Sequence, residues 1–315
     1  MRNIVVLFET KEIIEVVPVK SSTSVSIPES KADFFCLLNK EKYISIVTKL
    51  LEHIKIGDIY EINYCVEFFA ENMEIDPYKV FEKLNALTEA PFAQLLKAGD
   101  NWIICASPER FIKKTGNKLL TQPMKGTAAR GSTPEEDIRF KNMLAKSLKE
   151  QTENVMAVDV ARNDLSVIAK KSTVVTNELF GVQTFKNVHQ MVSTVSCELK
   201  NNIGFETILE ATFPPASMTG APKIKAVELI KKYELSPRGI YSGCVGSIDE
   251  NGDFDLAVVI RTIIYNEKEK SVSFHVGSAI TAGSNAHEEW NECLLKADSL
   301  LKALGTDISR VHFKA

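Results

Sequence analysis

A lysine lies in the middle of the segment Gln122–Gly131, which also carries a proline, two glycines, a threonine and an arginine. Proline restricts the backbone before Lys125, and Gly126 lets the chain bend sharply or approach a ligand closely. The pattern predicts a turn that holds the Lys125 amine in a defined position. Most lysines on turns are surface charges, so this segment alone leaves its function open.

Two pairs of glutamates follow, each with a spacing of three residues. Glu150 and Glu153 lie in one predicted helix, and Glu289 and Glu292 lie in another. Residues three apart share one face of a helix, and paired carboxylates suit Mg²⁺, which prefers oxygen ligands. Glu292 also precedes Lys296 by four residues, which is typical of a solvated helix surface. For each glutamate pair, a solvent-exposed helix surface is therefore the alternative to a metal site.

The sequence also contains features that suit an anionic ligand. Arg261 follows an apolar run, and a partly buried guanidinium needs an anion, for which a carboxylate is a good match. Backbone N–H groups of Gly277–Ala279 could bind a second anion. An Asp or Glu side chain of the protein itself is an equally good partner for Arg261. His189, alone in an apolar run, has the pattern of a core histidine.

The composition is that of a soluble globular protein, with 315 residues of which 44% are hydrophobic and 25% charged. A net charge of −3 gives no case for nucleic-acid binding, which needs a basic surface. Six cysteines lie far apart, with no pair at zinc or redox spacing. The apolar run at residues 4–8 ends at Glu9, which predicts a strand rather than a signal peptide or membrane span. The expected compartment is the cytoplasm.

Strands joined by hairpins alternate with long helices along the chain. Helices are predicted at 40–56, at 76–88, from Thr133 past Glu153, at 205–211, at 224–233, and from Ser284 or Asn285 to about Leu304. Strands are predicted at 59–69, on both sides of a turn at 98–101, and at 244–248, 254–264 and 271–276, after a β-rich start over about 1–40. This order favours antiparallel sheets in an α+β fold.

A series of blocks between about Gly57 and Leu304 resembles the chorismate-binding enzymes, and the blocks come in the same order. They are Ser107–Phe111, Pro123–Thr127, Glu153–Met156 with Asp159–Leu165, His189–Val195, Phe213–Lys223, Arg238–Gly243, Ile260–Thr262 and Glu289–Lys296. The resemblance implies one chorismate-binding catalytic domain over residues 1–315, with two large antiparallel sheets packed together and helices outside. It also implies a shortened N-terminal region that lacks the tryptophan pocket of anthranilate-forming relatives.

The resemblance implies a role for each candidate site residue. Glu153 and Glu292 match magnesium ligands, with Glu150 and Glu289 as inner or water-mediated partners. The residues matched to substrate binding are Arg261, Lys296, Tyr241, Thr219, Gly277 and Ser278, and those added to the catalytic set are His189 and Thr127. Chorismate is a dianion, so its site needs both cations and Mg²⁺, and the metal can assist departure of the C4 hydroxyl as a Lewis acid.

Lys125 separates the branches of this family. The anthranilate, isochorismate and salicylate enzymes usually carry alanine there, whereas Pro123–Thr127 resembles the branch that makes 4-amino-4-deoxychorismate. In that branch the lysine attacks C2 and expels the C4 hydroxyl, and ammonia then attacks C4 and expels the lysine. A nucleophilic lysine must be neutral, so its pKa is expected to be lowered by burial or by nearby cations. Glu109 matches the general acid, which needs a raised pKa.

The expected reaction converts chorismate and ammonia to 4-amino-4-deoxychorismate, toward 4-aminobenzoate and folate. The sequence shows neither an amidotransferase nor a lyase domain, so a separate glutamine amidotransferase subunit is the expected ammonia source. Anthranilate formation with loss of pyruvate, and a non-catalytic chorismate-binding homologue, are the alternatives. Glu61 and Ser278–Ala279 keep the second alternative open, because relatives that activate water carry lysine at position 61, ammonia users usually carry glutamine, and the family has more glycine near 278.

Overall fold

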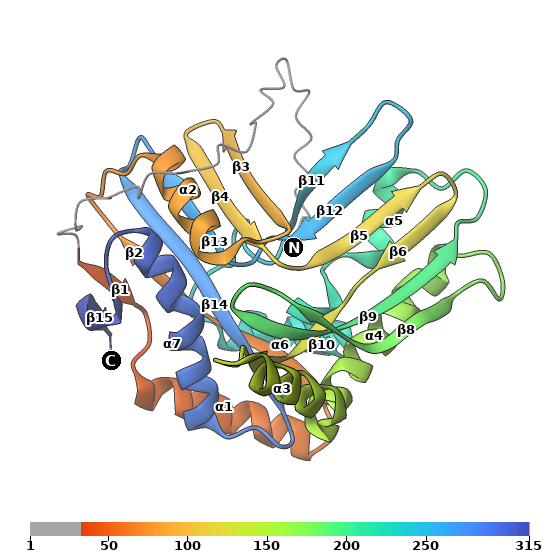
Figure 1. Ribbon diagram of the computed structural model, residues 1–315, viewed down its shortest axis with the longest axis horizontal. Helices are drawn as coiled ribbons and strands as arrows, with labels where there is room; N and C mark the ends of the chain where they lie inside the picture. The colour runs from red at the N-terminus through yellow and green to blue at the C-terminus, as the bar shows by residue number, and fades with distance from the viewer. Residues whose placement is uncertain (1–32, 315) are drawn as a thin grey trace.

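The computed structural model describes residues 33–314, which form two β-sheets with helices outside them (Figure 1). The expected α+β fold with two large antiparallel sheets is confirmed. Within the described range, only β1 and β15 pair in parallel. Most of the β-rich start expected over 1–40 lies outside the described residues. None of the helices in the described range is long and apolar enough to cross a membrane.

The first sheet has eight strands in the order β15-β1-β2-β14-β13-β4-β3, with β10 paired to β2. Its long central ladder joins β2 to β14, from Ala70 opposite Val272 to Glu61 opposite Thr281. The strands are β1 Phe34–Cys36, β2 Glu61–Ala70, β3 Phe92–Ala98, β4 Asn101–Ser107, β10 Gly220–Ala221, β13 Thr262–Asn266, β14 Ser271–Thr281 and β15 Val311–Phe313. Both strands of the ladder are mostly buried, as their β-branched and aromatic content suggests.

The second sheet has seven strands in the order β11-β12-β5-β6-β9-β7, with β8 also paired to β9. The strands are β5 Arg110–Thr115, β6 Lys118–Thr121, β7 Met124–Ala129, β8 Val175–Thr184, β9 Val188–Glu198, β11 Cys244–Ile248 and β12 Phe254–Val258. The strand predicted at 244–248 pairs with the start of the strand predicted at 254–264, and Asp249–Gly252 forms the hairpin between them. The chain passes between the sheets where β4 leads into β5 and where β12 leads into β13, so residues at those two links lie where the sheets meet.

Side chains cap the starts of several helices. The helices are α1 Lys40–Lys55, α2 Pro77–Thr88, α3 Pro134–Lys146, α4 Leu148–Ile168, α5 Phe205–Thr212, α6 Lys223–Tyr233 and α7 Ala286–Ala303, with 3₁₀ turns η1 Ala216–Met218 and η2 Ile308–Arg310. Thr133 accepts a hydrogen bond from the Glu136 N–H, and Asn285 accepts bonds from the second and third residues of α7. These side chains satisfy backbone donors that a helix start would otherwise leave unpaired.

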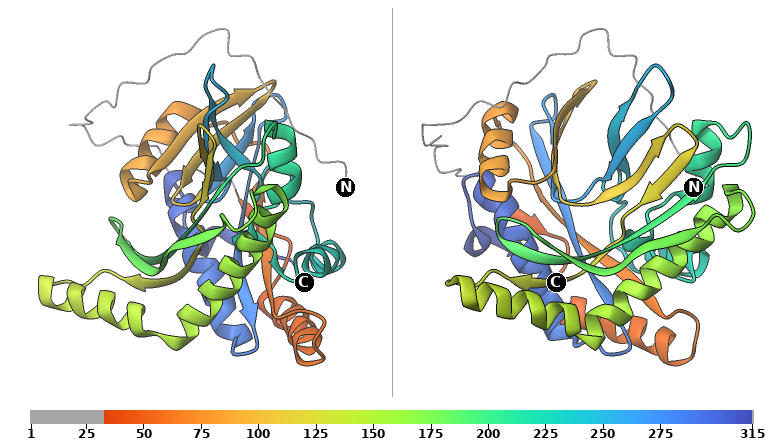
Figure 2. Two further views of the ribbon diagram at one scale, coloured as in Figure 1. Left: turned by 90° about the vertical axis from the view of Figure 1, so that its right-hand side faces the viewer. Right: turned by 45° about the vertical axis from the view of Figure 1, so that its right-hand side comes forward.

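The helices divide between the two sheets. α1 and α7 pack against each other and on β14, α6 packs on β2 and β10, and α4 packs on β7 and β9. Two separate groups of buried apolar side chains result, one under α1 and α7 and the other under α4 and α5. The two views in Figure 2 show α3 projecting away from the body of the molecule, beyond the sheet edge formed by β7.

Two predicted elements are interrupted where function is expected. The helix predicted from Thr133 past Glu153 is broken at Ser147, which caps α4 by accepting a hydrogen bond from the Glu150 N–H at 3.4 Å. The strand predicted over 254–264 breaks between β12 and β13, because the chain must leave one sheet and enter the other. The break at Ser147 places Glu150 in the first turn of α4, and the break between β12 and β13 places Arg261 where the chain changes sheets.

Candidate active site

Lys125 lies in β7, at a β-bulge and not in the predicted turn. The pairing of β7 with β9 is regular at Met124 and again from Thr127, but its register shifts between them. Gly126 has φ = +89°, and a Cβ added there would lie 2.9 Å from Glu150 Oε2. The positive φ therefore favours glycine, and a larger residue would also force the Glu150 side chain to move. Bulges of this kind direct a side chain out of a regular ladder.

The Lys125 ammonium is buried and pairs with Glu61. Both side chains are almost inaccessible, at 9% and 2% exposure, and Nζ donates a hydrogen bond to Glu61 Oε1. Burial lowers the pKa of Lys125, but Glu61, with smaller effects from Glu153 and Glu109, outweighs burial and raises it overall. The predicted lowering of the lysine pKa is therefore wrong. Sequence reasoning left Glu61 without a role, and the structure makes it the partner of Lys125.

Glu109 lies beside this pair, at the link from β4 to β5. It is 5% exposed, and its Oε1 accepts a hydrogen bond of 3.4 Å from the backbone N–H of Met124. Burial raises the pKa of Glu109 to about 7, against the attraction of the neighbouring Lys125. A substantial fraction of Glu109 is therefore protonated near neutral pH. This agrees with the raised pKa that a general acid needs.

The four predicted metal ligands lie on two helices, Glu150 and Glu153 on α4 and Glu289 and Glu292 on α7. Lys149 is influenced electrostatically by all four carboxylates, which places them in one neighbourhood. Burial raises the pKa of Glu153 to about 7, and repulsion from Glu150 adds to this effect. Sequence reasoning missed Lys149, although it directly precedes the first glutamate.

The oxygen atoms of the four glutamates are of the kind that a divalent cation prefers. The four side chains do not converge on one point. Among residues 33–314, no three His, Cys, Asp or Glu side chains are placed to hold a metal ion. Glu292 pairs with Lys296 at 2.5 Å. However, Glu153 Oε1 is buried without any hydrogen-bond partner in the described range. A buried carboxylate oxygen without a partner is costly, and a hard cation would satisfy it.

Arg261 lies between β12 and β13, at the point where the chain passes from one sheet to the other. Its backbone has φ = +51°, a left-handed conformation that residues other than glycine rarely adopt. The guanidinium donates a hydrogen bond of 3.3 Å to the backbone oxygen of Lys296 and forms no ion pair with a described carboxylate. The structural alternative, an arginine paired with an acidic side chain, is not observed in this part of the chain. A half-buried guanidinium without a counter-ion suits an anionic ligand.

Gly277 and Ser278, whose backbone N–H groups were expected to bind an anion, lie in a regular strand. Both lie inside β14, where Gly277 is opposite Cys65. A Cβ at position 277 would lie 2.6 Å from the Cys65 sulfur, so glycine here serves close packing between strands. The Gly277 backbone oxygen accepts a hydrogen bond of 2.7 Å from Lys296 Nζ, and the buried Ser278 hydroxyl bonds to that of Tyr43 at 2.9 Å. Their predicted part in substrate binding remains a prediction.

Tyr241 and Thr219 are both buried, and both lie close to Arg238, to which sequence reasoning gave no role. Arg238 donates to the backbone oxygens of Met218 at 2.6 Å and Asn63 at 2.8 Å. Its guanidinium thus connects η1, which leads into Thr219, with β2. Tyr241, three residues after Arg238, stacks on His275 with ring centres 5.1 Å apart. These contacts fix two predicted pocket residues against the first sheet.

His189 and Thr127 lie near Lys125 in the sheet but bond elsewhere. His189 is 1% exposed and is hydrogen-bonded to Asp137 of α3 at 2.9 Å and to Thr184 at 3.0 Å. Thr127 is exposed and accepts a hydrogen bond from Gln190. The observed contacts of His189 anchor α3, which agrees with the core-histidine alternative. A catalytic role for either residue remains a prediction.

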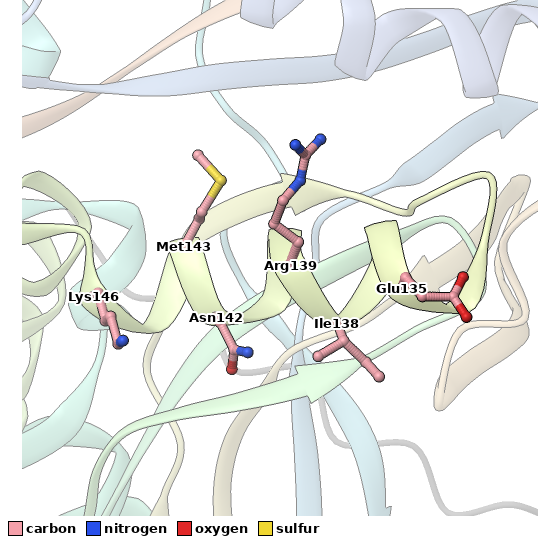
Figure 3. A pocket seen from close by; sticks show the side chains of 6 residues that line it. All are labelled: Glu135, Ile138, Arg139, Asn142, Met143 and Lys146. Atoms are coloured by element: carbon pink, nitrogen blue, oxygen red, sulfur yellow. The ribbon is translucent and has the colours of Figure 1, made fainter.

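A surface hollow runs along α3 but contains none of these residues. Its lining consists of Glu135, Ile138, Arg139, Asn142, Met143 and Lys146. Figure 3 shows that these side chains spread outward from the helix instead of pointing toward one another. A binding site normally gathers a few polar groups that point to one ligand. The candidate active site therefore remains the region between Lys125 and the two glutamate pairs.

The chain belongs to the chorismate-binding enzymes. The family model described as chorismate binding enzyme matches residues 9–302. This assignment confirms the resemblance based on the sequence blocks around Lys125, Arg261 and the glutamate pairs.

Individual relatives include members of two branches of this family. A probable chloroplastic aminodeoxychorismate synthase of Oryza sativa is 39% identical over 90% of this chain and 32% of its own length. Aminodeoxychorismate synthase component 1 of Bacillus subtilis is 32% identical over 88% of this chain and 58% of its own length. The crystal structure of anthranilate synthase component I from Streptococcus pneumoniae superposes with a TM-score of 0.79, at 29% identity, covering 87% of this chain and 60% of that one. The chain thus spans about a third to three-fifths of these proteins.

Proposed function

We propose that this protein is an aminodeoxychorismate synthase component 1, which converts chorismate and ammonia to 4-amino-4-deoxychorismate. The observation that carries the proposal is the buried Lys125 at a bulge, bonded to Glu61 and adjacent to Glu109. A buried amine next to a carboxyl group that is protonated near neutral pH suits nucleophilic attack coupled to departure of a hydroxyl. The names of the rice and Bacillus relatives support the same branch.

In the proposed reaction the Lys125 amine forms a bond to C2 of chorismate as the C4–O bond breaks. Glu109 donates its proton to the departing hydroxyl, which leaves as water. Ammonia then forms the C4–N bond, and the C2–Nζ bond breaks to release the lysine. Arg261 and Lys296 provide the cationic groups for the two carboxylates of the substrate, because Arg261 has no acidic partner in the described structure.

We propose Mg²⁺ as the cofactor, with Glu153 and Glu292 as direct ligands and Glu150 and Glu289 as inner or water-mediated partners. When bound, the metal would supply Lewis-acid assistance to the C4 hydroxyl and offset the charge of the substrate. Burial already raises the pKa of Glu150, Glu153 and Glu289. α4 and α7 therefore hold carboxylates close together, which costs free energy that a bound cation would offset.

The proposal includes a partner and a setting. The name component 1 on the Bacillus relative supports a second component, which we propose is a glutamine amidotransferase on a separate chain that supplies ammonia. The product would feed the synthesis of 4-aminobenzoate and folate. The six cysteines are free thiols, five of them buried, which suits the reducing cytoplasm.

Product analysis tests the proposal. The purified protein is incubated with chorismate, Mg²⁺ and ammonium, and the products are separated by chromatography with and without added aminodeoxychorismate lyase. We expect 4-amino-4-deoxychorismate, which the lyase converts to 4-aminobenzoate. Anthranilate would instead place the protein with the Streptococcus enzyme's branch. Binding of chorismate without any product, even with an amidotransferase subunit and glutamine, would support the non-catalytic alternative.

Replacing Arg261 by methionine is expected to weaken chorismate binding more than turnover. Removing one partner of a close charge pair costs about 2–5 kcal/mol, and the lower figure is about a thirtyfold rise in KM. Steady-state kinetics with saturating ammonium would measure the KM for chorismate. Arg162→Met, on the exposed face of α4, is the matched control and should leave KM unchanged. An unchanged KM in Arg261→Met would remove Arg261 from the substrate site.

A further inference from the structure

We propose that the Ser217 hydroxyl donates a hydrogen bond to the Glu109 carboxylate as Glu109 gives up its proton to the departing hydroxyl of the substrate. The inference rests on the function proposed above and gives a role to a residue outside the predicted set of site residues. Its basis is a buried hydroxyl that lies beside the general acid and completes no hydrogen bond in the described part of the chain.

The Ser217 hydroxyl differs from its neighbours in having no partner. Ser217 lies in η1 and is 6% exposed. Before it, Thr212 Oγ1 donates to the Ile208 backbone oxygen at 2.7 Å. After it, Thr219 Oγ1 donates to the Pro215 backbone oxygen at 3.2 Å. Ser217 Oγ completes no hydrogen bond with any residue in the range 33–314. A buried polar group without a partner costs free energy, so a function for this hydroxyl is a reasonable explanation.

The loop that carries Ser217 packs against the segment that carries Glu109. Phe213, at the start of the loop, meets Phe111 edge to face with ring centres 6.3 Å apart. Met218, directly after Ser217, is buried in the same apolar cluster as Phe111. Because Phe111 is only two residues after Glu109, these contacts hold the loop beside the general acid.

Arg238 fixes the same loop to the first sheet. One terminal nitrogen of its guanidinium donates to the Met218 backbone oxygen at 2.6 Å, and the other donates to the Asn63 backbone oxygen at 2.8 Å. The Asn63 N–H in turn donates to the Thr219 backbone oxygen at 2.8 Å. The two residues that follow Ser217 are therefore tied to β2, which leaves the hydroxyl little freedom to move away.

Glu109 needs a further donor once it has lost its proton. Within the described residues, the Met124 N–H completes a hydrogen bond to this carboxyl only at a long 3.4 Å. Lys125, the cation that acts on Glu109, is already bonded to Glu61. Burial raises the pKa of Glu109 to about 7, and Ser217 ranks first among the groups that oppose this effect. A donor aimed at a carboxyl group that becomes charged during the reaction stabilises the transition state more than the ground state.

The proposed step balances in protons and bonds. As Lys125 attacks C2, the C4–O bond breaks and its electron pair leaves with the oxygen. The O–H bond of Glu109 breaks, and its proton joins that oxygen to give water. The negative charge left on Glu109 accepts a hydrogen bond from Ser217 Oγ, whose own O–H bond stays intact. Ser217 is therefore a donor to the general acid and transfers no proton itself.

Ser217→Ala tests the role, because it removes one oxygen atom and little volume. We expect kcat to fall at least about tenfold, the loss typical of a hydrogen bond to a charged group. The urea concentration at the midpoint of unfolding should equal that of wild type or rise, since the variant removes a buried hydroxyl without a partner. A wild-type kcat would overturn the inference. A clear loss of stability would overturn it too, because the hydroxyl would then be bonded in the resting protein.

Two further variants separate the hydroxyl from the space it fills. Ser217→Cys nearly keeps the size of the side chain but offers only a weak S–H donor, so its kcat should fall almost as far. A wild-type rate in Ser217→Cys would assign the effect to packing and refute the inference. Ser166→Ala, which removes an exposed hydroxyl bonded to the Asn163 backbone oxygen on α4, is the matched control and should keep the wild-type rate.

A second measurement works without turnover. Protein with isotope-labelled glutamate carboxyl groups is titrated and followed by NMR, and the Glu109 signal is assigned by its absence in Glu109→Gln. Ser217→Ala should raise the midpoint of the Glu109 titration, because a donor that favours the charged carboxylate is lost. An unchanged midpoint would refute the inference. A wild-type protein that forms no 4-amino-4-deoxychorismate would refute the proposed function, with the titration still testing Ser217, whereas a wild-type rate in Ser217→Ala refutes this inference alone.

Discussion

Replacing Lys125 by alanine should lower the rate of 4-amino-4-deoxychorismate formation by at least about a thousandfold, since removal of a nucleophile leaves only binding and positioning effects. The amine is buried at a bulge, and no other lysine of the described structure bonds to Glu61. Chromatographic assay of the product under saturating chorismate and ammonium measures the change. Turnover at the wild-type rate in Lys125→Ala would rule out a covalent lysine intermediate.

This variant needs a control for stability, because it leaves Glu61 buried without its partner. Breaking a buried ion pair from one side typically costs about 3–5 kcal/mol. The double variant Lys125→Met with Glu61→Gln removes both charges and should unfold in urea closer to wild type, yet stay inactive. Lys113→Ala changes a partly exposed lysine on β5 that pairs with Asp255, and this variant should keep full activity. Together these variants separate a lost nucleophile from a damaged fold.

Removing Mg²⁺ with EDTA should abolish product formation, to below about a thousandth of the initial rate, and excess Mg²⁺ should restore it. The expectation follows from the four carboxylates on α4 and α7, of which Glu153 keeps one buried oxygen without a partner. Full activity in EDTA would refute the metal site.

A matched pair of variants locates the metal. Glu153→Gln should need a much higher Mg²⁺ concentration for half-maximal activity, because an amide oxygen is a weaker ligand for a hard cation. Glu288→Gln changes an exposed glutamate in the first turn of α7 and should have no effect. An identical Mg²⁺ dependence for the two variants would argue against Glu153 as a ligand.

Local chemistry in the sequence accounts for much of the fold. Capping at Thr133 and Asn285, proline at the first position of α2, and the Asp249–Gly252 hairpin all act over a few residues, so each was predictable. The break at Ser147 also has a local signal, since serine three residues before Glu150 forms a capping pattern. That signal was hidden within a longer helical pattern.

The parts of the site that sequence reasoning missed depend on distant contacts. Glu61 meets Lys125 only because β2 and β7, from different sheets, bring their ends together. The lowered pKa predicted for Lys125 assumed burial or nearby cations, and the reversal comes from that tertiary contact with a carboxylate. Arg261 was expected within a strand, because an apolar run gives no sign that the chain changes sheets there. Arg238 bonds to backbone atoms, which sequence patterns do not reveal.

The missing side chain of Gly126 has a consequence for how this protein can evolve. A methyl group at this position would strain the bulge that carries Lys125 and would also push against the Glu150 carboxylate on α4. Lys125 and the carboxylates of α4 therefore cannot change position independently, since one substitution at Gly126 disturbs both. We expect a lineage that replaces Gly126 to carry compensating changes on β7 and on α4, at Glu150 in particular.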